Sequence, residues 1–181
     1  AFLVVKEDNS YAVLAFRGTE VAKLTDIKTD IRASMVSLIE GRVHKGFINA
    51  YKSVRTEIEK SVAKVDGLPL YITGHSLGAA LATVATQFLE SNPVFRDQIA
   101  ACYTFGSPRV GNDQFDREFK SAIYRVVNTT DIVTVIPLLA MGYIHIGDIR
   151  FLSRNKGEFR RGIPIFGRLL FFLGAALGKL F

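Results

Sequence analysis

A serine between two glycines is the residue of this sequence that is best suited to chemistry. Ser76 is the central residue of a G-H-S-L-G motif at positions 74–78, directly after the apolar run Leu70–Thr73 and directly before an alanine-rich stretch. A strand, a sharp turn and a helix in this order form a nucleophile elbow, which exposes the serine hydroxyl for attack on an acyl carbonyl. The alternative is a serine that only caps the helix. We predict a nucleophile at Ser76.

A serine hydroxyl needs a general base, and the base needs an acid to orient it. In this architecture the chain order is serine, acid, histidine. Of the three histidines, His44 precedes Ser76, and His75 is its neighbour on a tight turn where adjacent side chains diverge. His145, in a loop bracketed by glycines, is therefore the predicted base, with a purely structural histidine as the alternative.

The predicted acid is Asp131, one of six acidic residues between the serine and His145. Asp131 comes just after the apolar run Ile123–Asn128, whereas the others belong mostly to polar helical stretches. Sites in open α/β sheets gather at the carboxyl ends of strands, which favours Asp131 over the others. An Asx turn is the structural alternative at this position.

Acyl transfer also needs hydrogen-bond donors for the developing oxyanion. The backbone N–H of Leu77 directly follows the nucleophile and begins the predicted helix, so it is the first predicted donor. Thr19, after an early strand, offers a hydroxyl and an N–H and is the second. The predicted mechanism uses no metal and no organic cofactor.

Alternation of strand-like and helix-like segments predicts an α/β domain with a largely parallel sheet. In the segment 20–40, apolar residues recur at intervals of three and four, which favours a helix or a mobile, lid-like stretch. A single domain is expected over 1–181, with its core at about 2–152. The predicted strands are Phe2–Lys6, Tyr11–Arg17, Leu70–Thr73, Ala100–Phe105 and Ile123–Asn128, and the predicted helices are Phe47–Val65, Leu77–Leu89 and a short one around Asp113–Ser121.

The net charge of +6 is confined to the end of this 181-residue chain. Residues 1–149 are electrically balanced, whereas residues 150–181 hold seven basic side chains and one acidic one. Thirteen of the nineteen residues from Ile163 to Phe181 are apolar, so the basic residues lie among apolar ones and a nucleic-acid partner is not expected. The tail at about 160–181 is expected either to contact a lipid surface as an interfacial helix, or to pack on the body or on a neighbouring subunit.

Several motifs occur in the same order as in a known family. The motifs are A-F-R-G-T at 15–19, V-H-K-G-F at 43–47, G-H-S-L-G-A-A-L-A at 74–82, F-G-S-P-R-V-G-N at 105–112, R-V-V-N at 125–128 before Asp131, Pro137, and Y-I-H-I-G at 143–147. Over roughly residues 2–152 the chain resembles the class 3 lipases, the fungal-type triacylglycerol lipases. The resemblance implies an α/β-hydrolase fold, a triad of Ser76, Asp131 and His145, and an oxyanion hole at Thr19 and Leu77. It also implies a lid at about Glu20–Ile31 and a structural role for His44.

The chain departs from that family in several places. Cys102 is its only cysteine, whereas secreted fungal members carry several disulfides, which indicates a different, bacterial branch. The elements that usually precede the first hairpin are absent, so the N-terminal part looks trimmed, and the residues after His145 do not match the expected ending. The segment 20–31 holds no aromatic residue, which predicts modest interfacial activation or a more polar ester, unless it is an ordinary surface helix.

The expected function is hydrolysis of acylglycerol ester bonds through an acyl-enzyme intermediate. Within this class, a phospholipase A1 or a glycolipid acyl hydrolase is the alternative. From another class, a non-catalytic lipid-binding module is the alternative. No signal peptide is recognised at Ala1–Val5, so both secretion after processing and a bacterial cytoplasmic location are compatible with the sequence.

Overall fold

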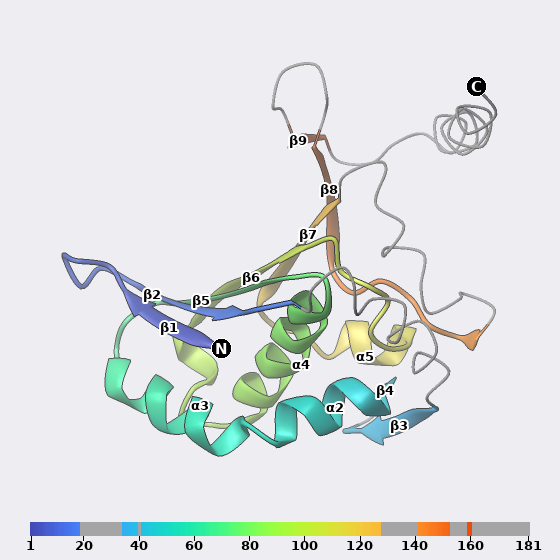
Figure 1. Ribbon diagram of the computed structural model, residues 1–181, viewed down its shortest axis with the longest axis horizontal. Coiled ribbons are helices and arrows are strands. Elements are labelled where there is room, and N and C mark those ends of the chain that lie inside the picture. Colours follow the sequence, from blue (N-terminus) through green and yellow to red (C-terminus); the bar gives the residue numbers. More distant parts are fainter. Residues whose placement is uncertain (19–33, 40, 128–140, 153–158, 161–181) are drawn as a thin grey trace.

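The computed structural model describes residues 1–18, 34–39, 41–127, 141–152 and 159–160 (Figure 1). Thr19, Asp131, the predicted lid at 20–31 and the tail from residue 161 onward lie outside the described residues. Ser76, Leu77 and His145 lie within them.

A seven-stranded sheet organises the described part of the chain (Figure 1). Its five central strands are mutually parallel, and one antiparallel strand closes each edge. The predicted α/β class with a largely parallel sheet is confirmed. In spatial order the strands are β1 (Phe2–Val5), β2 (Ala12–Phe16), β5 (Leu70–His75), β6 (Ile99–Phe105), β7 (Ala122–Val127), β8 (Asp148–Leu152) and β9 (Phe159–Arg160).

The register of the parallel strands brings their carboxyl ends to one edge of the sheet. His75 on β5 pairs with Phe105 on β6, which is level with Val126 on β7 and Arg150 on β8. The β5–α4 turn begins at this edge, where ligand sites of open α/β sheets are usually found.

The helices of the described residues lie on one side of the sheet (Figure 1). The central helix, α4 (Leu77–Ser91), packs on β2, β5 and β6, and α2 (Lys45–Lys52) packs on α4. A second, two-stranded sheet joins them from the same side and contacts α5 through β4. The remaining elements are β3 (Met35–Leu38), β4 (Gly41–His44), α3 (Arg55–Val62), α5 (Asp113–Arg117) and the 3-10 turns η2 (Ala63–Val65) and η3 (Arg96–Gln98).

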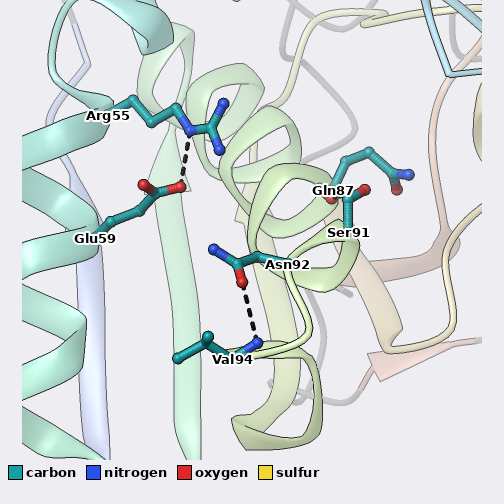
Figure 2. Close-up of polar contacts among 6 residues, drawn as sticks. All are labelled: Arg55, Glu59, Gln87, Ser91, Asn92 and Val94. Carbon is teal, nitrogen blue, oxygen red and sulfur yellow. Dashed lines mark hydrogen bonds and ion pairs between the residues drawn. The ribbon is translucent and has the colours of Figure 1, made fainter.

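The helix expected over Phe47–Val65 is wrong in one respect, because the structure divides it into α2, α3 and η2. The break falls at Val54, whose backbone leaves the helical region at φ −122° and ψ 2°. After this turn α2 packs on α4, whereas α3 packs on α2 and η2 and reaches α4 through Arg55. The Arg55 guanidinium carbon lies 4.9 Å from the Phe88 ring centroid on α4, and Arg55 Nε donates to Glu59 Oε1 at 2.7 Å (Figure 2).

The carboxyl end of α4 is followed by a turn that the Asn92 side chain holds. Asn92 follows its last residue, and Asn92 Oδ1 accepts a hydrogen bond from Val94 N at 3.0 Å (Figure 2). No helix among the described residues combines the length and the apolar character needed to cross a membrane.

Small side chains let α4 approach the sheet closely. Ala79, Ala80, Ala82 and Ala85 are fully buried against it. On the sheet side, Leu14, Leu70 and Ile72 are buried in the same core, which therefore lies between the sheet and α4.

We expect Ile72→Ala to lower the free energy of unfolding by about 2–5 kcal/mol, because it leaves a cavity at a fully buried position. Val94→Ala, at a 70% exposed position, serves as the control and should cost less than about 0.5 kcal/mol. Urea denaturation monitored by circular dichroism measures both. Equal losses in the two variants would contradict this location of the core.

Candidate active site

Ser76 occupies the turn between β5 and α4 in a strained backbone conformation. Its φ is 54° and its ψ is −125°. Side chains other than glycine rarely adopt a positive φ, and such a residue costs about 1–3 kcal/mol. A hydrogen bond from Ser76 N to Phe105 O at 3.0 Å joins the turn to the end of β6. This is the sharp strand-to-helix turn that the sequence predicts.

The glycines of the motif are required by close backbone contacts. A Cβ on Gly74 would overlap the carbonyl group of Gly78, and a Cβ on Gly78 would overlap the carbonyl oxygen of Phe16. β5, the first turn of α4 and the end of β2 therefore touch through their backbones. Neither position accepts alanine without a shift of backbone atoms.

The Ser76 hydroxyl is not used to hold the helix. Ser76 is the N-cap residue of α4, but its side chain makes no capping hydrogen bond. Ser76 Oγ is buried and has no hydrogen-bond partner among the described residues. This geometry counts against the capping alternative and leaves the hydroxyl available for chemistry.

Ser76 is less accessible than an elbow serine is expected to be, with 4% of its surface exposed. One reason is the chain after β2. A Cβ on Gly18 would lie 2.6 Å from His75 O and 3.5 Å from Ser76 Cβ, so this segment lies against the serine. Gly18 immediately precedes Thr19, the second predicted oxyanion donor, which itself lies outside the described residues.

Leu77 is the first residue of α4. The first N–H groups of a helix have no carbonyl partner within it, and the helix dipole makes this end favourable for negative charge. The carbonyl of Ser76 accepts the N–H groups of Ala79 and Ala80, at 2.9 and 3.4 Å. The N–H of Leu77 therefore lies beside the serine at the positive end of the central helix.

His145 lies in a loop that is tied to neighbouring segments on both sides. Ile144 N donates to Gly111 O at 2.7 Å, and Gly147 N donates to Asp116 Oδ1 at 2.8 Å. His145 itself is half-buried. Sequence reasoning missed Asp116 as the anchor of this loop, because an acidic residue in a short polar helix carries no signal of such a role. Burial raises the pKa of Asp116, and the hydrogen bond from Gly147 opposes this effect.

The structure does not join His145 to Ser76 by a hydrogen bond. Ser76 follows the carboxyl end of β5, whereas His145 precedes the amino end of β8, which is parallel to it. Of the predicted site residues, the structure brings together Ser76 and Leu77 at the start of α4. The role of His145 as the base stays a prediction.

The other two histidines, His44 and His75, are excluded as the base by their positions in the sequence. His75 is exposed. His44 is buried, and its Nδ1 accepts a hydrogen bond from Gly46 N at 3.2 Å at the start of α2. The His44 ring lies 4.3 Å from that of Phe47, centroid to centroid. A structural role for His44 is confirmed.

A family model described as lipase (class 3) matches residues 13–141, which is more than half of the chain. The chain belongs to the class 3 lipase family. The match includes the β2 end, the whole elbow and the segment with Asp131, and it ends just before the loop that carries His145.

Curated relatives of this chain include enzymes named for two kinds of substrate. It is 35% identical over 157 residues to the secreted mono- and diacylglycerol lipase A of Penicillium cyclopium, covering 80% of the chain and 49% of the relative. It is 29% identical over 177 residues to phospholipase A1-II 1 of Oryza sativa subsp. indica, covering 81% and 44%. The chain thus spans about half the length of the curated relatives it matches.

Solved structures confirm the α/β-hydrolase fold expected for this chain. The triacylglyceride lipase of Rhizomucor miehei superposes with a TM-score of 0.75 at 26% identity, covering 87% of this chain and 63% of that one. The lipase of Rhizopus microsporus var. chinensis gives a TM-score of 0.73 at 25% identity, covering 87% and 58%.

The strain at Ser76 predicts an unusual order of stability for two variants. Ser76→Gly should be more stable than Ser76→Ala by about 1 kcal/mol, because glycine accepts the positive φ that alanine does not. At Ser61, inside α3, the order should reverse by about 1 kcal/mol, because alanine is the better helix former. Thermal or urea unfolding of the four variants measures the difference. A more stable Ser76→Ala would contradict the strained turn.

Proposed function

We propose that this member of the class 3 lipase family hydrolyses carboxylic ester bonds of lipids, with Ser76 as the nucleophile. The observation that carries the proposal is the hydroxyl of Ser76, which is unbonded among the described residues and is held on a strained turn at the N-terminus of α4. A helix cap gains nothing from this geometry, whereas a serine that must meet an acyl carbonyl beside backbone donors needs it.

The reaction then proceeds in two halves. Ser76 Oγ attacks the acyl carbonyl carbon while the base takes its proton, and the Leu77 N–H and Thr19 bind the oxyanion. Collapse of this intermediate expels the alcohol, which takes the proton from the base, and leaves an acyl enzyme. Water, deprotonated by the same base, attacks the acyl enzyme and releases the fatty acid. In this proposal His145 is the base, Asp131 orients it, and no metal or cofactor takes part.

Acylglycerols are the proposed substrate class. Two relatives that are at least 35% identical, from Penicillium cyclopium and Fusarium solani, are named mono- and diacylglycerol lipases, and both are named as secreted. A phospholipid is the second candidate, because the relative from rice is named a phospholipase A1. An extracellular site of action, one of the two locations compatible with the sequence, agrees with the names of the fungal relatives.

Ser76→Ala should lower the hydrolysis of p-nitrophenyl esters by about four to six orders of magnitude and abolish labelling by a fluorophosphonate probe, because both reactions need the hydroxyl. Ser91→Ala, at the other end of the same helix, should leave both unchanged. Turnover near the wild-type rate in Ser76→Ala would exclude the assignment. Lipid binding by a wild-type chain that is not labelled would support the non-catalytic alternative.

His145→Ala tests the part of the proposed triad that the structure does not join. If His145 is the base, this variant should lose activity by about 10⁴-fold, and the matched variant His75→Ala should lose much less. Initial rates on a soluble ester measure both, with circular dichroism as the control for folding. Activity retained in His145→Ala would mean that another residue is the base, while the labelling of Ser76 would still test the nucleophile separately.

The substrate class is tested by comparing initial rates on emulsified diacylglycerol and on phosphatidylcholine vesicles at equal accessible lipid. The proposal expects the higher rate on diacylglycerol. A higher rate on the vesicles would assign the phospholipase A1 activity instead.

A further inference from the structure

One face of the central sheet carries no helix of the described residues. Side chains alternate along each strand, so Ile72, Cys102 and Ile123 point toward α4 and are buried. Their neighbours Tyr71 and Tyr103 point to the opposite side, and Figure 1 shows the described helices on the α4 side alone. A sheet of parallel strands is normally covered on both faces. Within the described part of the chain, this second face therefore lacks the helical cover that a parallel sheet normally has.

The uncovered side chains form an aromatic surface, here called the open face, made of Tyr71, Tyr103, Phe105, Tyr124, Val126 and Arg150. Tyr103 and Tyr124 stack with 5.1 Å between ring centroids, and the Arg150 guanidinium carbon lies 4.9 Å from the Tyr124 ring centroid. Tyr103 and Phe105 remain 38% and 41% exposed. The last five of these residues line a hollow of about 360 Å³.

We propose that the C-terminal segment of this same chain, residues 163–181, docks on the open face as an amphipathic helix. The position of Arg160, from which the chain continues to residues 163–181, supports this segment as the occupant. β9 ends at Arg160 and pairs with β8, and β8 carries Arg150 at the border of the hollow. A segment tethered there has an effective concentration in the millimolar range, which favours it over a free partner.

The length of the segment fits the width of the open face. Residues 165–181 as an α-helix would be about 25 Å long at 1.5 Å per residue. From β8 to β1 the sheet has five strand-to-strand spacings in the order β8-β7-β6-β5-β2-β1. At about 4.8 Å each, they span about 24 Å. One helix that starts near β8 would therefore reach across to the opposite edge.

The residue pattern of the segment gives such a helix one apolar side. At 100° per residue, seven large apolar side chains fall within one stripe, while Arg168 and Lys179 lie together beside it. Three glycines weaken the helix as an isolated element, so it needs packing to form. The seven residues of the stripe are Ile165, Phe166, Leu169, Phe172, Leu173, Leu177 and Leu180.

A disulfide trap tests the docking in the full chain. In the variant Val126→Cys with Leu173→Cys, mild oxidation should form an intrachain disulfide, seen as a faster-migrating monomer on a non-reducing gel. The control Lys64→Cys with Leu173→Cys places the first cysteine at an exposed position next to α3 and should form none. The native Cys102 should not interfere, because it is buried and burial raises its thiol pKa to about 12.

The other occupants give different results and would overturn the proposal. A disulfide-linked dimer would place a second copy on the open face. No disulfide, together with cosedimentation of the protein with anionic vesicles that is lost on deleting 163–181, would assign the segment to a lipid surface.

A second measurement does not depend on cysteine chemistry. Trypsin should cleave after Arg168 several-fold faster in Val126→Asp than in the wild type, because a charge on the open face releases the segment. Val94→Asp places the same charge at a 70% exposed position away from the open face and should leave the rate unchanged. Equal cleavage rates in both variants and the wild type would overturn the proposal. Neither experiment uses ester hydrolysis, so their results are independent of the proposed function.

Discussion

Direct backbone contact between three segments is the constraint on which the candidate site depends. The end of β2, the end of β5 and the first turn of α4 approach one another so closely that Gly74 and Gly78 have no room for a Cβ, and Gly18 closes the same contact from the next segment. This packing holds Ser76 at a positive φ, a conformation that its own preferences oppose. The surrounding core, which includes the buried small residues of α4, supplies the stability that offsets this strain.

Much of this arrangement could be predicted from the sequence, because it depends on local signals. The turn at Ser76 follows from an apolar run, a glycine motif and an alanine-rich helix that are contiguous in the chain, and the hairpin before it follows from two short β-branched runs. The break at Val54 could not be predicted in the same way. Apolar residues continue at helical spacing through that point, and the contacts that differ are tertiary, since α2 packs on α4 whereas α3 packs on α2 and η2.

The base of the site was harder to predict for a similar reason. Elimination among three histidines left His145, but elimination uses only chain order and contains no information on distance. The structure adds the pairing of β7 with β8. His145 comes just before the amino end of β8, and β8 runs parallel to the strand whose carboxyl end leads to Ser76. Thr19 and Asp131 were predicted from the ends of neighbouring strands and lie outside the described residues, so their roles stay predictions.

The bridges around Gly111 have a consequence for the order of folding. Gly111 pairs with Val43 on one side and with Ile144 on the other, so three segments that are far apart in the chain form one small ladder. Contacts between distant segments require long loops to close first, and they form slowly compared with helices and hairpins. During synthesis the ladder is incomplete until Ile144 has left the ribosome. The neighbourhood of His145 is therefore assembled after the β1–β2 hairpin and α4 have had time to form.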